Sequence, residues 1–365
     1  MLNRVDMFFC ILSGLLLATM VSCSGNDHAV TRQDEKIKVG VFDGYGGSET
    51  CKWEAFEAVS IDSAMDVRYV TSADIAGGCL DSLDAIVIPG GGGSRQYMNL
   101  GDENRSRIID FVKTGGGAVG ICAGAYLFSN TPNYACMKLN GAAAIDIEHD
   151  NRGHGLAKFT LNDEGNTLFP ELAGRDTSYV MYYEGPVFVK ADDTITYDVF
   201  ATMWSDVHEE GNAPKNMTNN KPLFIGNDYG EGRVFSSIAH PEATPGMRWL
   251  VPRMIRWTLK KDYVSYSDDV VRPHIHTREI LFSKAMLKEE ASLYDVLLYG
   301  SEKEKIDAID WLQANMSWDA KRWIQGMLYD ASPLVRQRAA KYIADMELTY
   351  YTRDVEESVC SSPSF

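Results

Sequence analysis

Hydrophobic positions in the first half of the chain fall into two alternating kinds of segment. Short runs are apolar at successive positions, which is typical of strands buried on both faces of a parallel sheet. Between them, apolar residues three or four apart indicate helices. The predicted strands span 37–42, 67–70, 84–88 and 117–121, and the predicted helices span 53–61 and 104–113. This alternation predicts an α/β fold with a mainly parallel sheet.

The second half of the chain has two further patterns. Closely spaced strands that favour antiparallel pairing are predicted at 156–161, 187–189, 196–204, 223–227 and 233–238, and a closing helix at 245–261. After 277 the pattern is helical only, with amphipathic segments at 305–314, 317–328 and 333–346. The stretch 330–340 resembles the second helix of a HEAT repeat. A small all-α module is therefore expected to follow the α/β domain.

The N-terminus has the pattern of an export signal. Arg4 precedes an apolar run at 7–21 that is shorter than the ~20 residues of a membrane-spanning helix. The run ends in Val21-Ser22-Cys23, which resembles a bacterial lipobox. The resemblance implies cleavage before Cys23, lipidation of its thiol and a lipid-anchored location in the bacterial cell envelope, on the periplasmic or surface face. An ordinary signal peptide is the alternative.

These patterns divide the chain into six predicted segments. They are a lipoprotein signal peptide (1–22), a tether (23–35), the α/β domain (36–262), a linker (263–277), a helical HEAT-like module (278–351) and a polar tail (352–365).

Composition and motifs exclude several partners. Lys and Arg total 35 against 51 Asp and Glu, and a net charge of −16 disfavours nucleic acid. We expect no cofactor, because Glu49 replaces the third glycine of a dinucleotide fingerprint. We expect no metal, because the seven cysteines form neither a CxxC motif nor a Cys/His cluster. Whether Cys51 and Cys79 form a disulfide stays open.

The candidate nucleophile is Cys122, at the end of a predicted strand. Gly120 and Gly124 flank it, as a crowded strand-to-helix turn requires. The start of the following helix favours the thiolate form. The amide of Ala123 is a candidate oxyanion donor, and the loop at Gly91 and Gly92, which ends another strand, offers a second donor. The alternative is a buried structural cysteine beside glycines that serve packing.

The candidate base and its orienting acid are His240 and Glu242. They follow a predicted strand directly, and Pro241 between them favours an extended backbone. Two residues apart in an extended segment, both side chains point the same way. A carboxylate beside an imidazole fixes its tautomer and stabilises the imidazolium, as a cysteine nucleophile requires of its base.

Residues 120–124 with residues 240–242 resemble the class I glutamine amidotransferase-like superfamily, and 89–92 resembles its oxyanion strand. A closer resemblance is to the amidotransferase-like domain at the N-terminus of biotin–protein ligases, carried by segments 42–46, 115–117, 122–126 and 182–185. It covers 36–262 and implies a flavodoxin-like sandwich. It also implies Cys122 as nucleophile, His240 as base and Glu242 as orienter. The substrate-contacting residues that it implies are Gly44, Tyr126 and Tyr183.

The sequence differs from these families at positions that bear on the functional hypothesis. Tyr126 stands where glutamine amidotransferases tend to have Gln, and no biotin-adenylating motif is present, so the chain is not expected to be a biotin ligase by itself. The hypothesis is an envelope lipoprotein that hydrolyses a small-molecule or peptide amide through a Cys-His-Glu triad. The alternative is a non-catalytic ligand-binding or scaffold lipoprotein that docks a protein partner through its C-terminal helices.

Overall fold

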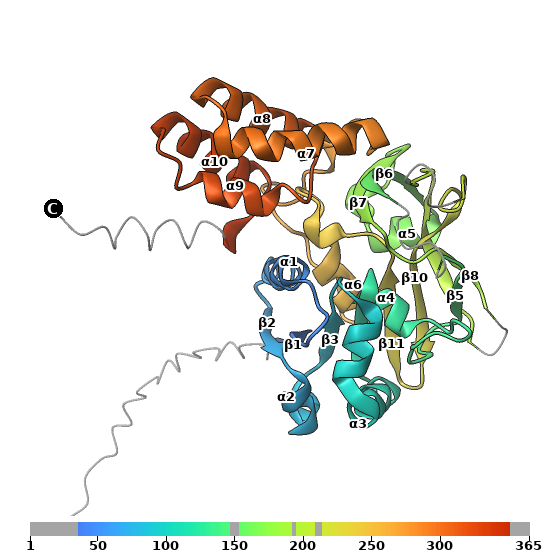
Figure 1. Cartoon of the computed structure of the whole chain (residues 1–365). Helices are drawn as coiled ribbons and strands as arrows, with labels where there is room; N and C mark the ends of the chain where they lie inside the picture. The colour runs from blue at the N-terminus through green and yellow to red at the C-terminus, as the bar shows by residue number, and fades with distance from the viewer. Residues whose placement is uncertain (1–35, 147–152, 192–194, 209–213, 351–365) are drawn as a thin grey trace, which may run out of the picture. The chain divides into compact units, whose positions relative to one another are not determined.

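A computed structural model describes residues 36–146, 153–191, 195–208 and 214–350 (Figure 1). The predicted signal peptide, the lipidation site Cys23, the tether and the polar tail lie outside the described residues. The described residues all belong to one compact unit. None of the described helices is long and apolar enough to cross a membrane.

One half of the main sheet is parallel. Its strand order is β2-β1-β3-β4-β11. The strands are β1 (Ile37–Phe42), β2 (Met65–Val70), β3 (Ala85–Ile88), β4 (Gly117–Ile121) and β11 (Gly232–Ser237). Because these strands are parallel, the segments that follow β3 and β4, including the loop at 89–92 and Cys122, meet at one edge of the sheet.

The other half of the sheet is antiparallel and continues from β11. It runs β10-β9-β6-β12, with β7 paired to β6. These strands are β6 (His154–Leu161), β7 (Ser178–Tyr183), β9 (Asp198–Met203), β10 (Lys221–Tyr229) and β12 (Ile280–Leu281). A separate pair joins β5 (Ala142–Ala144) to β8 (Phe188–Lys190). This half brings β7 next to the segment after β11, where His240 lies.

Helices cover both faces of the parallel half. Alternate residues of one strand enter different cores, so that Val41 packs with α1 (Glu49–Val59) and α6 (Leu250–Thr258), whereas Phe42 packs with α3 (Gly93–Lys113). The short α4 (Ala123–Phe128) lies on the α3 face. The fold is therefore the flavodoxin-like α/β sandwich that the sequence predicts. Short helices in the described part also include α2 (Ser72–Ala76) and α5 (Asp163–Leu168).

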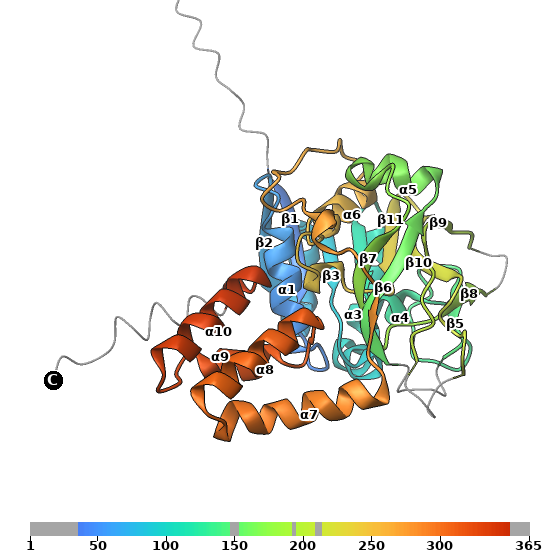
Figure 2. The same cartoon turned by 90° about the horizontal axis from the view of Figure 1, so that it is seen from above.

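Four helices follow the sandwich in the described chain. They are α7 (Lys284–Tyr299), α8 (Glu302–Ala314), α9 (Lys321–Met327) and α10 (Pro333–Asp345). Their core is not closed on itself, because Cys51, Leu156 and Met181 of the sandwich pack in the same apolar cluster. Figures 1 and 2 both place α9 and α10 near α1. The HEAT-like assignment and the domain boundaries stay predictions.

The bounds of the predicted elements agree best with the structure for strands whose residues are nearly all buried. The strands expected at 37–42 and 117–121 have those bounds. The helix α1 begins earlier than predicted, at Glu49, because its first turn is rich in polar residues. The element α3 is interrupted at Gly101 (φ 71°, ψ 165°), and the predicted helix 104–113 corresponds to the part that follows this break. The sequence pattern predicts neither β7 nor α7; in α7 only Glu290 and Leu297 are buried, which leaves a weak apolar pattern.

Candidate active site

Cys122 occupies a strained turn between β4 and α4. Its backbone has φ 51° and ψ −103°, a conformation that costs a non-glycine residue about 1–3 kcal/mol. Both flanking glycines are required sterically. A Cβ on Gly124 would lie 2.0 Å from the carbonyl oxygen of Ile88, and one on Gly120 would lie 2.6 Å from the carbonyl carbon of Gly124. The glycines allow this tight turn, which holds the thiol at the edge of the sheet.

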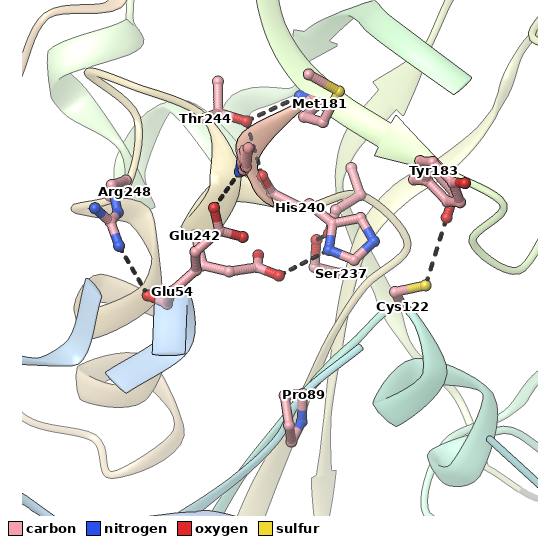
Figure 3. A network of polar contacts seen from close by, with 12 residues as sticks. Glu54, Pro89, Cys122, Met181, Tyr183, Ser237, His240, Glu242, Thr244 and Arg248 are labelled. Atoms are coloured by element: carbon pink, nitrogen blue, oxygen red, sulfur yellow. Dashed lines mark hydrogen bonds and ion pairs between the residues drawn. The ribbon is translucent and has the colours of Figure 1, made fainter. Parts of the chain in front are cut away.

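His240 and Glu242 form a buried pair beside Cys122. His240 Nδ1 donates to Glu242 Oε1 over 2.7 Å, and both side chains are almost fully buried (Figure 3). The backbone of His240 is fixed as well, since its N–H donates to the Met181 carbonyl (2.7 Å) and its carbonyl accepts from Thr244 Oγ1 (2.7 Å). With Nδ1 engaged by the carboxylate, the Nε2 edge of the ring is the one available to a thiol.

Electrostatics around His240 favour its protonated form. Burial by itself would lower the pKa of His240, but the Glu242 carboxylate raises it, and the neighbouring side chains of Cys122 and Cys51 raise it further. The net result is a pKa well above the ordinary histidine value. Cys122 lines the same cavity as this imidazole, which readily accepts and holds a proton. In the same structure Cys122 Sγ donates to the Tyr183 carbonyl over 3.6 Å.

A second thiol, which the sequence does not predict, contacts the same imidazole. A Cβ on Gly90 would lie 2.8 Å from both Cys51 Sγ and His240 Cε1, so the two groups are neighbours. Burial raises the pKa of Cys51, and His240 only partly opposes that shift. Cys51 is thus a protonated thiol beside the His240 imidazole at neutral pH. Cys51 and Cys79 are free thiols in this structure.

The C-terminal helices contribute to the site, which sequence reasoning missed. The Trp318 ring packs edge-on against His240 with centroids 4.3 Å apart, and lies 5.4 Å from the Tyr183 ring. Lys321, in α9, forms a fully buried ion pair with Glu54 of α1. No spacing in the sequence signals these contacts, because they join segments at opposite ends of the chain.

Glu54 interacts electrostatically with both Lys321 and Glu242. Burial raises the pKa of Glu54, the charges of Lys321 and Arg248 lower it, and the nearby Glu242 carboxylate raises it again. Arg248 also donates to the Glu54 carbonyl over 3.2 Å (Figure 3). The net result is a raised pKa for Glu54, because Lys321 and Arg248 only partly offset the effect of burial.

Cys122 lies where two cavities meet. One, of about 420 Å³, is lined by His240, Tyr183 and Trp318 together with Cys122. The other, of about 510 Å³, is lined by Tyr126, Tyr134 and Arg95 together with Cys122. The predicted contact residues Tyr183 and Tyr126 thus face different cavities. The hydroxyl of Tyr126 donates to Asp146, and that of Tyr183 donates to Asp319 over 3.4 Å.

The three predicted oxyanion residues, Gly91, Gly92 and Ala123, differ in their positions and backbone contacts. Gly91 lines both cavities; its φ is 138°, and a Cβ on it would lie 2.4 Å from the Gly46 oxygen, so only glycine fits there. The N–H of Gly92 donates to the Gly46 carbonyl over 2.7 Å, so it is engaged elsewhere. Ala123 begins α4. Gly44 lines a neighbouring cavity with Arg95 rather than either cavity at Cys122.

Two trios of metal-ligand side chains occur among the described residues, each with ligand atoms within 4.8 Å of one another. They are Cys51, His240 and Glu242, and His154, Glu290 and Asp319. In the first trio, His240 and Glu242 already satisfy each other by a hydrogen bond. Sequence spacing signals neither trio, because each joins distant segments. The expectation of no metal and no cofactor stays a prediction.

Comparisons with known proteins agree with this architecture. A family model described as biotin-protein ligase, N terminal, matches residues 37–289, more than half of the chain. The chain belongs to this family. The match extends through the predicted linker into α7. No curated protein matches the sequence.

Solved structures show more distant similarity. PurLQS from Thermotoga maritima has 17% identity and a TM-score of 0.45, covering 62% of this chain and 98% of that chain. A protein from Parabacteroides merdae described as ThuA-like has 18% identity and a TM-score of 0.43, covering 64% and 99%. The glutaminase domain of Trypanosoma brucei CTPS, with bound acivicin, has 13% identity and a TM-score of 0.40, covering 63% and 96%.

Proposed function

We propose that the protein is a cysteine-dependent amide hydrolase with Cys122 as nucleophile, His240 as general base and acid, and Glu242 as orienter. The observation that carries the proposal is the buried 2.7 Å bond from His240 Nδ1 to Glu242 Oε1, with Cys122 lining the same cavity as that ring. This is the order of contacts that an activated thiol nucleophile requires.

The chemistry follows from these positions. The thiolate of Cys122 attacks the amide carbon while its proton resides on His240, whose imidazolium Glu242 stabilises. The oxyanion that develops lies near Gly91 and Ala123, whose amides are the candidate donors. His240 then returns the proton to the departing amine, and water hydrolyses the thioester to a carboxylic acid. Trp318 shields the imidazole edge from solvent.

The test is a turnover screen with matched cysteine variants. Wild-type protein, Cys122→Ala and Cys136→Ala are incubated with amides, peptides and glutamine, and products are quantified by mass spectrometry. Cys136 is a buried free thiol outside both cavities at Cys122 and controls for loss of a cysteine. The proposal expects activity in the wild type and in Cys136→Ala, and none in Cys122→Ala. Activity that survives Cys122→Ala would contradict it, and so would an inert wild type, which would favour the ligand-binding alternative.

We propose in addition that Cys23 is lipidated and anchors the protein to a membrane of the cell envelope. The support is the short apolar run that ends in Val21-Ser22-Cys23. Detergent-phase partitioning of the protein expressed in a bacterium tests this. The wild type is expected in the detergent phase and Cys23→Ser in the aqueous phase or uncleaved. A Cys23→Ser protein that is processed and partitions like the wild type would refute lipidation.

A further inference from the structure

We propose that the substrate is a secondary amide whose amine part is an amino acid or peptide bearing a carboxylate. This inference rests on the proposed hydrolysis at Cys122 and specifies its substrate class. It follows from three features: the two cavities that meet at Cys122, the position of His240 in only one of them, and the side chains that the C-terminal helices add to that cavity.

The two cavities imply substituents on both sides of the reacting carbon. Cys122 and Gly91 line both, so a carbonyl placed between them has space in two directions. A primary amide releases ammonia, which is about the size of a water molecule, whose share of liquid volume is about 30 Å³. The cavities of about 420 and 510 Å³ each exceed this volume many times. A secondary amide would occupy both.

The position of His240 assigns each cavity to one part of the substrate. The proton that His240 takes from Cys122 must pass to the amine nitrogen as the C–N bond breaks and the S–C bond is in place. His240 lines the smaller cavity and not the larger one. The amine part therefore belongs in the smaller cavity. The acyl part belongs beside Tyr126 and Tyr134 in the larger one.

The smaller cavity has the chemistry of an amino-acid site. Trp318 and Tyr183 form an aromatic wall, and Asp319 offers an acceptor for a backbone N–H group, as does Glu184, which lines both cavities. Two cations of α9 reach this cavity, but Lys321 is held in the buried pair with Glu54. Arg322 is exposed on its rim, and a guanidinium there suits a carboxylate of the amine part.

Matched pairs of amides test the assignment. N-acetyl amino-acid amides, Ac-Xaa-NH2, are compared with N-acetyl dipeptides, Ac-Xaa-Yaa, across all twenty residues at Xaa. Two quantities are measured: release of Ac-Xaa, and protection of Cys122 against iodoacetamide, which needs binding only. We expect faster release and stronger protection with the dipeptides. Arg322→Ala is expected to reduce the release of Ac-Xaa and the protection of Cys122 by about ten- to hundredfold with dipeptides. It is expected to leave both quantities unchanged with primary amides.

The controls separate the two proposals. Lys288→Ala removes a positive charge from exposed α7, outside the described cavities, and is expected to behave like the wild type. Protection by dipeptides without release would refute hydrolysis while supporting the two-sided site. Equal protection by the two series, better release from primary amides, or an Arg322→Ala protein that treats dipeptides as the wild type does would overturn the substrate assignment.

Discussion

At the scale of single residues, the His240–Glu242 pair determines how the site responds to pH. Burial lowers the pKa of His240, and the Glu242 carboxylate is the largest of the influences that raise it and prevail. A histidine whose pKa is raised by folding stabilises the folded state fully below its unfolded pKa, about 6.5. That contribution is lost as the pH rises through the folded pKa.

This direction of the pH dependence gives a stability prediction for Glu242→Gln, a substitution that keeps a hydrogen-bond acceptor but removes the charge. The variant should lower the free energy of unfolding relative to the wild type most strongly near pH 6, below the unfolded pKa of histidine, and the difference should shrink as the pH rises through the raised folded pKa of His240. Denaturant unfolding across this range measures it. A difference that is constant with pH, or that grows with pH, would show that Glu242 does not hold the His240 charge.

At the scale of elements, the turn between β4 and α4 depends on close backbone contact. Gly124→Ala would place a methyl group 2.0 Å from the Ile88 carbonyl oxygen, so a strand or helix must shift. We expect a loss of about 2 kcal/mol or more of stability. Gly326→Ala is the matched control, since nothing lies within 4 Å of its Cβ position in α9, and it should stabilise by about 0.5–1 kcal/mol. Equal effects of the two substitutions on thermal unfolding would contradict the steric account.

The helices and strands are predictable from the sequence where burial requires a regular pattern of apolar residues. β4 lies in the middle of the sheet with five consecutive buried residues, and the sequence predicts its bounds correctly. The sequence pattern does not predict β7, and it does not predict α7 because that half-buried helix has no continuous apolar face. The glycines around Cys122 predict the strand-to-helix turn because few other residues permit such an approach.

At the scale of the whole molecule, the C-terminal helices are part of the site. Their Lys321 and Trp318 reach Glu54 and His240, which lie far away in sequence. The sequence predicts an independent helical module, because local patterns carry no information about which side chain will oppose a buried carboxylate. The position of Cys51 beside His240 is unpredictable for the same reason.

A double-mutant cycle measures this link. Both side chains of the Lys321–Glu54 pair are almost fully buried, so removing one partner leaves an unpaired charge. Lys321→Met and Glu54→Gln should each cost about 3–5 kcal/mol of unfolding free energy, and the double variant should recover most of that loss. Additive losses in the double variant would mean that the helices are held by other contacts.

The most direct test of the central claim is the labelling of cysteines by iodoacetamide, mapped by mass spectrometry, in the wild type and in His240→Ala. The account predicts that Cys122 is the fastest thiol to react in the folded wild-type protein. It also predicts that His240→Ala slows the labelling of Cys122 most between about pH 6 and pH 7, where the imidazole would otherwise take the proton of the thiol. Faster labelling of Cys51, Cys79 or Cys136, or a Cys122 rate that His240→Ala leaves unchanged, would contradict a nucleophile paired with His240.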